Sequence, residues 1–200
     1  MKSFLKKQGR AAVIAGSMTF LAAAQATTVS PTSFTEMVSQ ADVIVTGQVQ
    51  SQRCEWRGTG SERRIVTIVT LEVQAAHKGA PPARLELQFL GGTVGDTTLE
   101  VSGVPQFKIG EKSILFVEKN GKKFCPLAGI YHGKLTIERE AGTGREILVR
   151  HNRQPLTDVR EIGADDGTMA RAAGADGTRQ PLSVGAFVGR IGQELGKPSP

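Results

Sequence analysis

The feature that most constrains the fold is a series of short apolar segments with strand periodicity, separated by glycine and proline. In the segment 65–76 one face is mostly apolar, and residues 85–89 alternate cleanly between apolar and polar side chains. The run 42–49 is rich in β-branched residues and the run 113–117 is apolar after Ser113, which is typical of well-buried strands. No helical pattern lies between successive strands, so the sequence predicts a mainly β fold, either a small closed barrel or a sandwich.

Helices are expected only at the two ends of this β region. Ser33 and Glu36 have the spacing of a capping box, which predicts a short helix from about Phe34 to Gln40. Ser183 is the expected cap of a second helix. That helix carries apolar residues at helical spacing, namely Val184, Phe187, Val188, Ile191 and Leu195. This apolar stripe predicts that the C-terminal helix packs on the sheet.

The segments between the strongest strand patterns complete the expected organisation. Gly47 interrupts the first strand and indicates a bulge or bend, and residues 53–62 are expected to form a loop. Asn120-Gly121 is a hairpin signal. Further short strands are expected at residues 97–101, 124–131, 135–137 and 145–149.

The sequence divides into four expected regions, beginning with an export signal at residues 1–26. The barrel domain is assigned to residues 27–157. Residues 158–180 are rich in Gly, Ala and Asp and offer few large apolar side chains, which predicts a flexible loop. Residues 181–200 hold the C-terminal helix and tail.

The export signal is predicted from three features of residues 1–26. Basic residues precede a short apolar run, and Ala24-Gln25-Ala26 has the small-x-small pattern of a cleavage site, so the mature chain is expected to begin at Thr27. The apolar run is short for a bilayer span. We therefore expect a periplasmic or extracellular protein with no membrane span after cleavage.

Removing the signal changes the charge of the chain. The full chain carries 25 Lys and Arg residues against 19 Asp and Glu residues, and four of the basic residues lie in the signal. The mature chain therefore has 21 basic residues and a net charge of +2. A charge this small gives no support to nucleic-acid binding.

The chain contains two cysteines, Cys54 and Cys125. An oxidising compartment favours a disulfide between them, which would stabilise the fold by roughly 4 kcal/mol in the chain-entropy model. Two buried free thiols and a metal site are the alternatives, although no histidine pattern with zinc-ligand spacing lies nearby.

Motifs for catalysis or cofactor binding are not found. His77, His132 and His151 are the only histidines, and the sequence contains no zinc-protease, nucleophile-elbow or nucleotide-binding pattern. We therefore expect a protein without enzymatic activity, cofactor or metal. Trp56 and Arg57 are candidate binding residues in the expected loop, because Trp and Arg are enriched at interface hot spots; packing over one end of the barrel is the structural alternative for Trp56.

The order of these motifs resembles the netrin-like family, an OB-type β-barrel found in tissue inhibitors of metalloproteinases and at the C-termini of complement proteins and netrins. The resemblance covers roughly residues 27–118. It rests on Ser30-Pro31 with Phe34, on the strand 41–49, on Val69-x-Leu71-x-Val73 followed by Lys78-Gly79, and on Gly110-Glu111 before Ile114-Leu115-Phe116.

The resemblance implies an exported protein-binding module, with a zinc endopeptidase as the partner. In the inhibitors of this family, backbone atoms of a disulfide-locked N-terminal cysteine bind the zinc of the protease. Thr27 and Thr28 hold that position here without the cysteine, and the resemblance makes them candidate binding residues. Alternatives that remain open are a hydrolase whose His, Ser and Asp converge only in the folded protein, and a structural component of the cell envelope.

Overall fold

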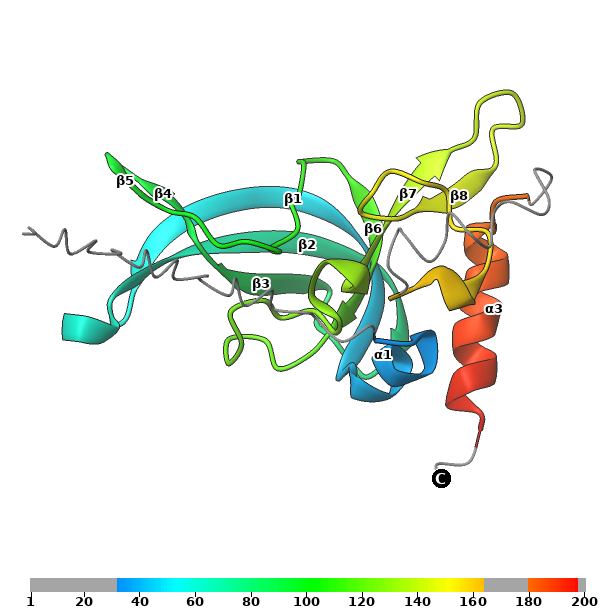
Figure 1. The fold of residues 1–200 in the computed structure, drawn as a ribbon, viewed down its shortest axis with the longest axis horizontal. Helices are drawn as coiled ribbons and strands as arrows, with labels where there is room; N and C mark the ends of the chain where they lie inside the picture. Colours follow the sequence, from blue (N-terminus) through cyan, green and yellow to red (C-terminus); the bar gives the residue numbers. More distant parts are fainter. Residues whose placement is uncertain (1–31, 164–179, 198–200) are drawn as a thin grey trace, which may run out of the picture. The chain divides into compact units, whose positions relative to one another are not determined.

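A long antiparallel hairpin forms the centre of the computed structural model, which describes residues 32–163 and 180–197 (Figure 1). Its strands, β1 (Val43–Arg57) and β2 (Arg64–Lys78), have 15 residues each. The other described elements, in chain order, are α1 (Phe34–Gln40), η1 (Gly60–Glu62), β3 (Arg84–Leu90), β4 (Gly92–Val94), β5 (Thr97–Leu99), β6 (Lys112–Val117), η2 (Ile130–Gly133), β7 (Lys134–Arg139), β8 (Glu146–Val149), η3 (Val159–Glu161) and α3 (Val184–Leu195).

Six strands form one antiparallel sheet in the order β3-β2-β1-β6-β7-β8, and β4 and β5 form a separate two-stranded hairpin. The pairing of β1 with β2 shifts register in three places, between Ile44 and Val45, between Thr46 and Gly47, and between Val49 and Ser51. Such shifts bend a strand and increase its twist. The bend expected at Gly47 is therefore confirmed.

Apolar side chains pack against both faces of β6 and of the first half of β1, which explains why the apolar residues there do not simply alternate with polar ones. In β6, Ile114 and Phe116 belong to a first core beneath the helices, while Leu115 and Val117 belong to a second core on the opposite face. Side chains alternate between faces with a period of two, so a four-residue apolar run supplies both cores.

The two helices close the first core, as the sequence predicts. The Ser33 hydroxyl accepts a hydrogen bond from the Glu36 backbone N–H at 3.2 Å, and the Glu36 carboxylate accepts one from the Ser33 N–H at 2.8 Å, which completes the capping box of α1. In α3, Phe187 and Ile191 are fully buried. No helix within residues 32–163 and 180–197 has the length and apolar character needed to cross a membrane.

The sheet does not close into a barrel, in contrast to the expectation, and other groups occupy both of its edges. At the β3 edge, the Asn120 side chain accepts a hydrogen bond from the Gln88 N–H at 3.1 Å and donates one to the Glu86 carbonyl at 2.7 Å. At the β8 edge, the Leu156 N–H donates to the Leu148 carbonyl at 2.7 Å. Strands β3 and β8 therefore have partners that keep them from pairing with each other.

Two local expectations are wrong. Residues 53–62 were expected as a loop, but β1 extends to Arg57. Residues 124–131 were expected as a strand, but they form a loop that leads into η2. Pro126 lacks an N–H for a ladder, and Gly129 and Ile130 both have positive φ angles, of 66° and 58°, which strand backbone does not adopt.

The segment expected to be flexible begins with ordered structure. Asp158 caps η3 through a 2.9 Å hydrogen bond from the Arg160 N–H, and Ile162 is buried in the first core. Residues 158–163 therefore belong to the folded protein. The remainder of the expected loop, residues 164–179, lies outside the described residues.

Candidate functional site

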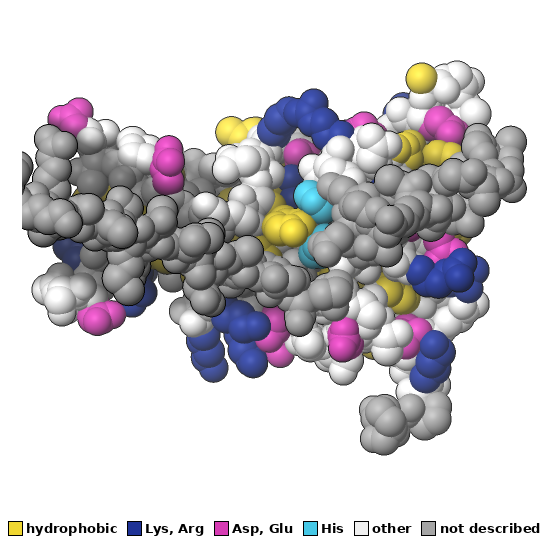
Figure 2. Space-filling model, in the orientation of Figure 1, with side chains coloured by type: hydrophobic (Ala, Val, Ile, Leu, Met, Phe, Trp, Pro, Cys, Tyr) yellow, Lys and Arg dark blue, Asp and Glu magenta, His cyan; other side chains and the backbone are white. Residues whose placement is uncertain are grey.

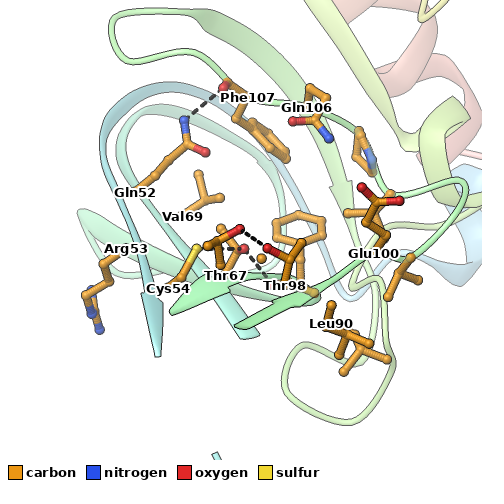
Figure 3. Close-up of a pocket in the computed structure, with 18 of the residues that line it drawn as sticks. Gln52, Arg53, Cys54, Thr67, Val69, Leu90, Thr98, Glu100, Gln106 and Phe107 are labelled. Carbon is orange, nitrogen blue, oxygen red and sulfur yellow. Dashed lines mark hydrogen bonds between the residues drawn. The ribbon is translucent and has the colours of Figure 1, made fainter. Parts of the chain in front are cut away.

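A cavity of about 680 Å³ opens on the face of the sheet that carries the second core, and we call it the groove (Figure 3). One wall comes from the outer half of the β1–β2 hairpin, and the other comes from β5 and the segment 100–107. The lining residues are Gln52, Arg53, Cys54, Thr67, Val69, Phe89, Leu90, Gly91, Gly92, Thr93, Thr98, Leu99, Glu100, Val101, Ser102, Val104, Pro105, Gln106 and Phe107.

Two phenylalanines and Val69 form the apolar side of the groove. The rings of Phe89 and Phe107 pack with their centroids 5.1 Å apart, and both residues are buried in the second core. The Gln52 side chain donates a 2.8 Å hydrogen bond to the Phe107 carbonyl, which ties the segment 100–107 to β1 (Figure 3). The groove is therefore an open extension of the core.

Hydroxyl groups and backbone form the polar side. Thr67 donates a 2.7 Å hydrogen bond to the Gly91 carbonyl, and its oxygen lies 3.4 Å from the Cys54 sulfur. Gly92 sits against this pair with φ of 127°, and a Cβ atom there would lie 2.6 Å from both the Cys54 sulfur and the Thr67 oxygen. A side chain at position 92 would therefore displace both groups.

Two charged residues, Arg53 and Glu100, line the groove, and both are exposed. Figure 3 shows Arg53 directed away from the cavity, where it pairs with Glu86 at 2.9 Å. The hydrogen bond to Glu86 raises the pKa of Arg53, and the hydrogen bond from Arg53 lowers the pKa of Glu86. Both groups thus stay ionised and paired, and neither is poised to exchange a proton near pH 7. The interior offers apolar contact and neutral hydrogen bonds, which suit binding.

The predicted loop residues Trp56 and Arg57 lie near the end of β1. The Arg63 guanidinium carbon stands 4.4 Å above the Trp56 ring, and Trp56 remains 36% exposed. Arg57 pairs with Glu55. Neither Trp56 nor Arg57 lines the groove, so the structure does not join these two candidates to it.

The expected Cys54–Cys125 disulfide is not formed, because both cysteines are free thiols. Cys54 is exposed on β1, while Cys125 is buried in the second core. Burial raises the pKa of the Cys125 thiol to about 11. Cys54 lies on β1, opposite Thr67 of β2. Cys125 comes directly after Phe124, whose carbonyl accepts a hydrogen bond from the Leu90 N–H of β3. Strand β2 lies between β1 and β3 in the sheet. The two cysteines are thus held at different strands.

The histidines do not form a catalytic group with the groove. His77 lies on β2 with its Nε2 2.8 Å from the Thr46 hydroxyl, and burial lowers its pKa. His132 and His151 pack with Tyr131, at centroid distances of 4.3 Å from Tyr131 to each. Figure 2 shows histidine side chains beside apolar ones on the face in view.

A second cavity, of about 560 Å³, adjoins this ring cluster. Tyr131, His151 and Arg150 line it together with Lys134, whose ammonium group pairs with Glu111 at 2.6 Å. Within the part of the chain that the structure describes, no group of three or more His, Cys, Asp or Glu residues is placed to hold a metal ion.

The other sequence candidates, Thr27 and Thr28, lie outside the described residues. Most groove residues were missed by sequence reasoning, because they come from four separate segments. One signal was available: Gly91-Gly92 and the Gly103-x-Pro105-x-Phe107 connection mark backbone with special geometry, and both border the groove. Searches against protein-family models, curated proteins and solved structures find no match. The function is therefore inferred from the sequence and the geometry of this chain.

Proposed function

We propose that the protein is an exported, non-catalytic binding module that accommodates an apolar side chain of a protein partner in the groove. The observation that carries the proposal is the open cavity above Phe89, Phe107 and Val69, with mostly uncharged hydrogen-bonding groups around it. An apolar floor with hydrogen-bonding groups placed around it is a common composition of a binding pocket. Export rests on the signal pattern of residues 1–26.

The architecture that we propose is an opened relative of the OB-type barrel. Its support is the order β3-β2-β1-β6-β7, in which the bent strand β1 lies between β2 and β6. OB folds bind their ligands on the sheet and adjoining loops, and the groove lies between the sheet and the segment 100–107.

The groove is tested with a random peptide library displayed on phage and selected against the immobilised full chain. Thr98 is exposed at the groove, so Thr98→Arg places a long charged side chain there without removing a buried group. We expect the selected peptides to lose affinity by at least about tenfold, the equivalent of about 1.4 kcal/mol.

The matched control is Thr143→Arg, which makes the same change at an exposed threonine in the turn between β7 and β8. It is expected to bind the peptides as the unchanged protein does. Equal binding by all three proteins, or a selection that yields no saturable binder, contradicts the proposal.

The partner that we propose is a zinc endopeptidase, engaged also by the mature N-terminus at Thr27 and Thr28. Its support is the netrin-like order of motifs and the cleavage site at Ala26. The test is inhibition of a panel of zinc endopeptidases by the mature chain. A version extended by one N-terminal residue is expected to lose inhibition, because the α-amino group would be displaced; equal inhibition by both versions contradicts this mechanism.

A further inference from the structure

Strand β1 has a neighbour on both sides only along its first half. Residues Val43–Gln48 pair with β6, and Val49 exchanges hydrogen bonds with Glu111 and Gly110 at 2.9 and 2.8 Å. From Gln50 to Arg57 the strand continues beside β2 alone. Its outer half is therefore a sheet edge, and such edges are templates for pairing with another strand.

The hydrogen bonds of β2 show which groups of β1 point to this edge. The Ile65 carbonyl accepts from the Gly91 N–H, so residue 65 faces the β3 side of β2. Backbone groups alternate along a strand, so Val66 and Ile68 face β1, opposite Glu55 and Arg53.

By the same alternation, the backbone groups of Gln52, Cys54 and Trp56 face the open edge. No hydrogen bond joins them to another backbone segment within residues 32–163 and 180–197. Gly92 of β4 approaches Cys54 at its side chain, and the Gln52 side chain donates to the Phe107 carbonyl. Neither contact uses a backbone N–H or carbonyl of the edge.

The sequence of this edge is complementary to itself in one antiparallel register. When Cys54 stands opposite Cys54 of a second copy, Arg53 faces Glu55 of that copy, and the two-fold axis repeats the pair. Opposite charges at facing positions stabilise strand pairing, and like charges destabilise it.

The alternative registers are worse. Centring on Arg53 or on Glu55 places like charges opposite each other. Centring on Trp56 leaves only three residues of β1 overlapped. Centring on Gln52 limits the overlap to residues 50–54, because the edge of Val49 is occupied by Glu111 and Gly110, and it places no opposite charges against each other.

We propose that two copies of the protein pair along the outer edge of β1, with residues 51–57 antiparallel and Cys54 at the two-fold axis. The pairing joins two six-stranded sheets into one continuous sheet and brings the two grooves to the same face of it, since facing residues of an antiparallel pair point to the same side.

The first test compares the oligomeric state of charge variants by analytical ultracentrifugation of the full chain. Arg53→Glu and Glu55→Arg each place like charges opposite one another and are expected to weaken the dimer by at least about tenfold. The double variant exchanges the two charges, restores both pairs and is expected to recover the dimer.

The matched control is Glu62→Arg, which reverses an exposed charge in η1, outside the paired register. It is expected to dimerise like the unchanged protein. A monomer at all concentrations, or a double variant no better than the single ones, overturns the proposal.

The second test traps the register with oxidised glutathione. Residues in a hydrogen-bonded antiparallel pair have Cα atoms about 5.5 Å apart, within the range of about 4.4–6.8 Å that a disulfide spans. Two Cys54 thiols then form one disulfide and reduce one oxidised glutathione to two reduced molecules, which carry away the two electrons and two protons.

We expect a covalent dimer on a non-reducing gel, retained in Cys125→Ser. Moving the thiol with Cys54→Ser and Trp56→Cys separates the two sulfurs by four residues, about 13 Å along the strand, and is expected to abolish the covalent dimer. Equal cross-linking from position 56, or none from Cys54, overturns this register.

Discussion

Replacing Phe187 by alanine tests how α3 is held on the sheet. Phe187 is fully buried, and its ring lies 5.5 Å from the centroid of Phe34 in α1 and 6.3 Å from that of Phe116 in β6. One side chain thus joins both helices to the sheet. Truncating a buried phenylalanine costs about 3–5 kcal/mol. With a urea m-value of about 2 kcal/mol/M, the midpoint of unfolding is expected to fall by about 2 M.

The matched control lies two residues further along the same helix. Gly189 is exposed, and a Cβ atom there would meet nothing within 4 Å. Gly189→Ala is expected to raise stability by up to about 1 kcal/mol through helix propensity. Urea unfolding followed by circular dichroism measures both variants. A loss below about 1 kcal/mol for Phe187→Ala would refute the packing of α3 described here.

Three further predictions concern single residues. Burial lowers the pKa of His77, so as the pH falls the unfolded chain binds a proton before the folded protein does, and the free energy of unfolding declines below about pH 6.5. His77→Gln should flatten this decline, measured by urea unfolding between about pH 7 and about pH 5. An unchanged pH dependence in the variant would contradict this prediction. Because burial raises the pKa of Cys125 to about 11, a thiol reagent at about pH 8 should label only Cys54 in the folded protein and both cysteines after denaturation, whereas two rapid equivalents in the folded protein would show that Cys125 is accessible. Ser33→Ala removes the cap that pairs with Glu36 and should cost about 1 kcal/mol in thermal unfolding; no change would mean that the capping box does not hold α1.

The parts of the fold that follow local rules are the parts that the sequence predicts. The capping box of α1, the apolar stripe of α3 and the alternation in β2 and β3 are each set by residues close together in the chain. The outer half of β1 has polar residues on both faces and no buried side chain after Val49. Without apolar alternation it looks like a loop, although its pairing with β2 holds it as a strand.

The groove was beyond sequence reasoning for a different reason. Gln52, Thr67, Phe89 and Thr98 come together only because the sheet bends and the segment 100–107 folds over it. The predicted disulfide rested on compartment alone, and compartment gives no information about which strands hold the two cysteines. The capping of the β3 edge by Asn120, which accompanies the unclosed sheet, likewise depends on tertiary contacts that no local pattern encodes.

The most direct measurement of the central claim is an NMR titration of the isotope-labelled full chain with a peptide selected on it. Binding in the groove is expected to shift the amide signals of Thr67, Gly91 and Thr98, which surround the cavity, while the signals of the turn at Thr143 stay in place. Shifts confined to that turn or to the rings around Tyr131, with the groove signals unchanged, would contradict the account.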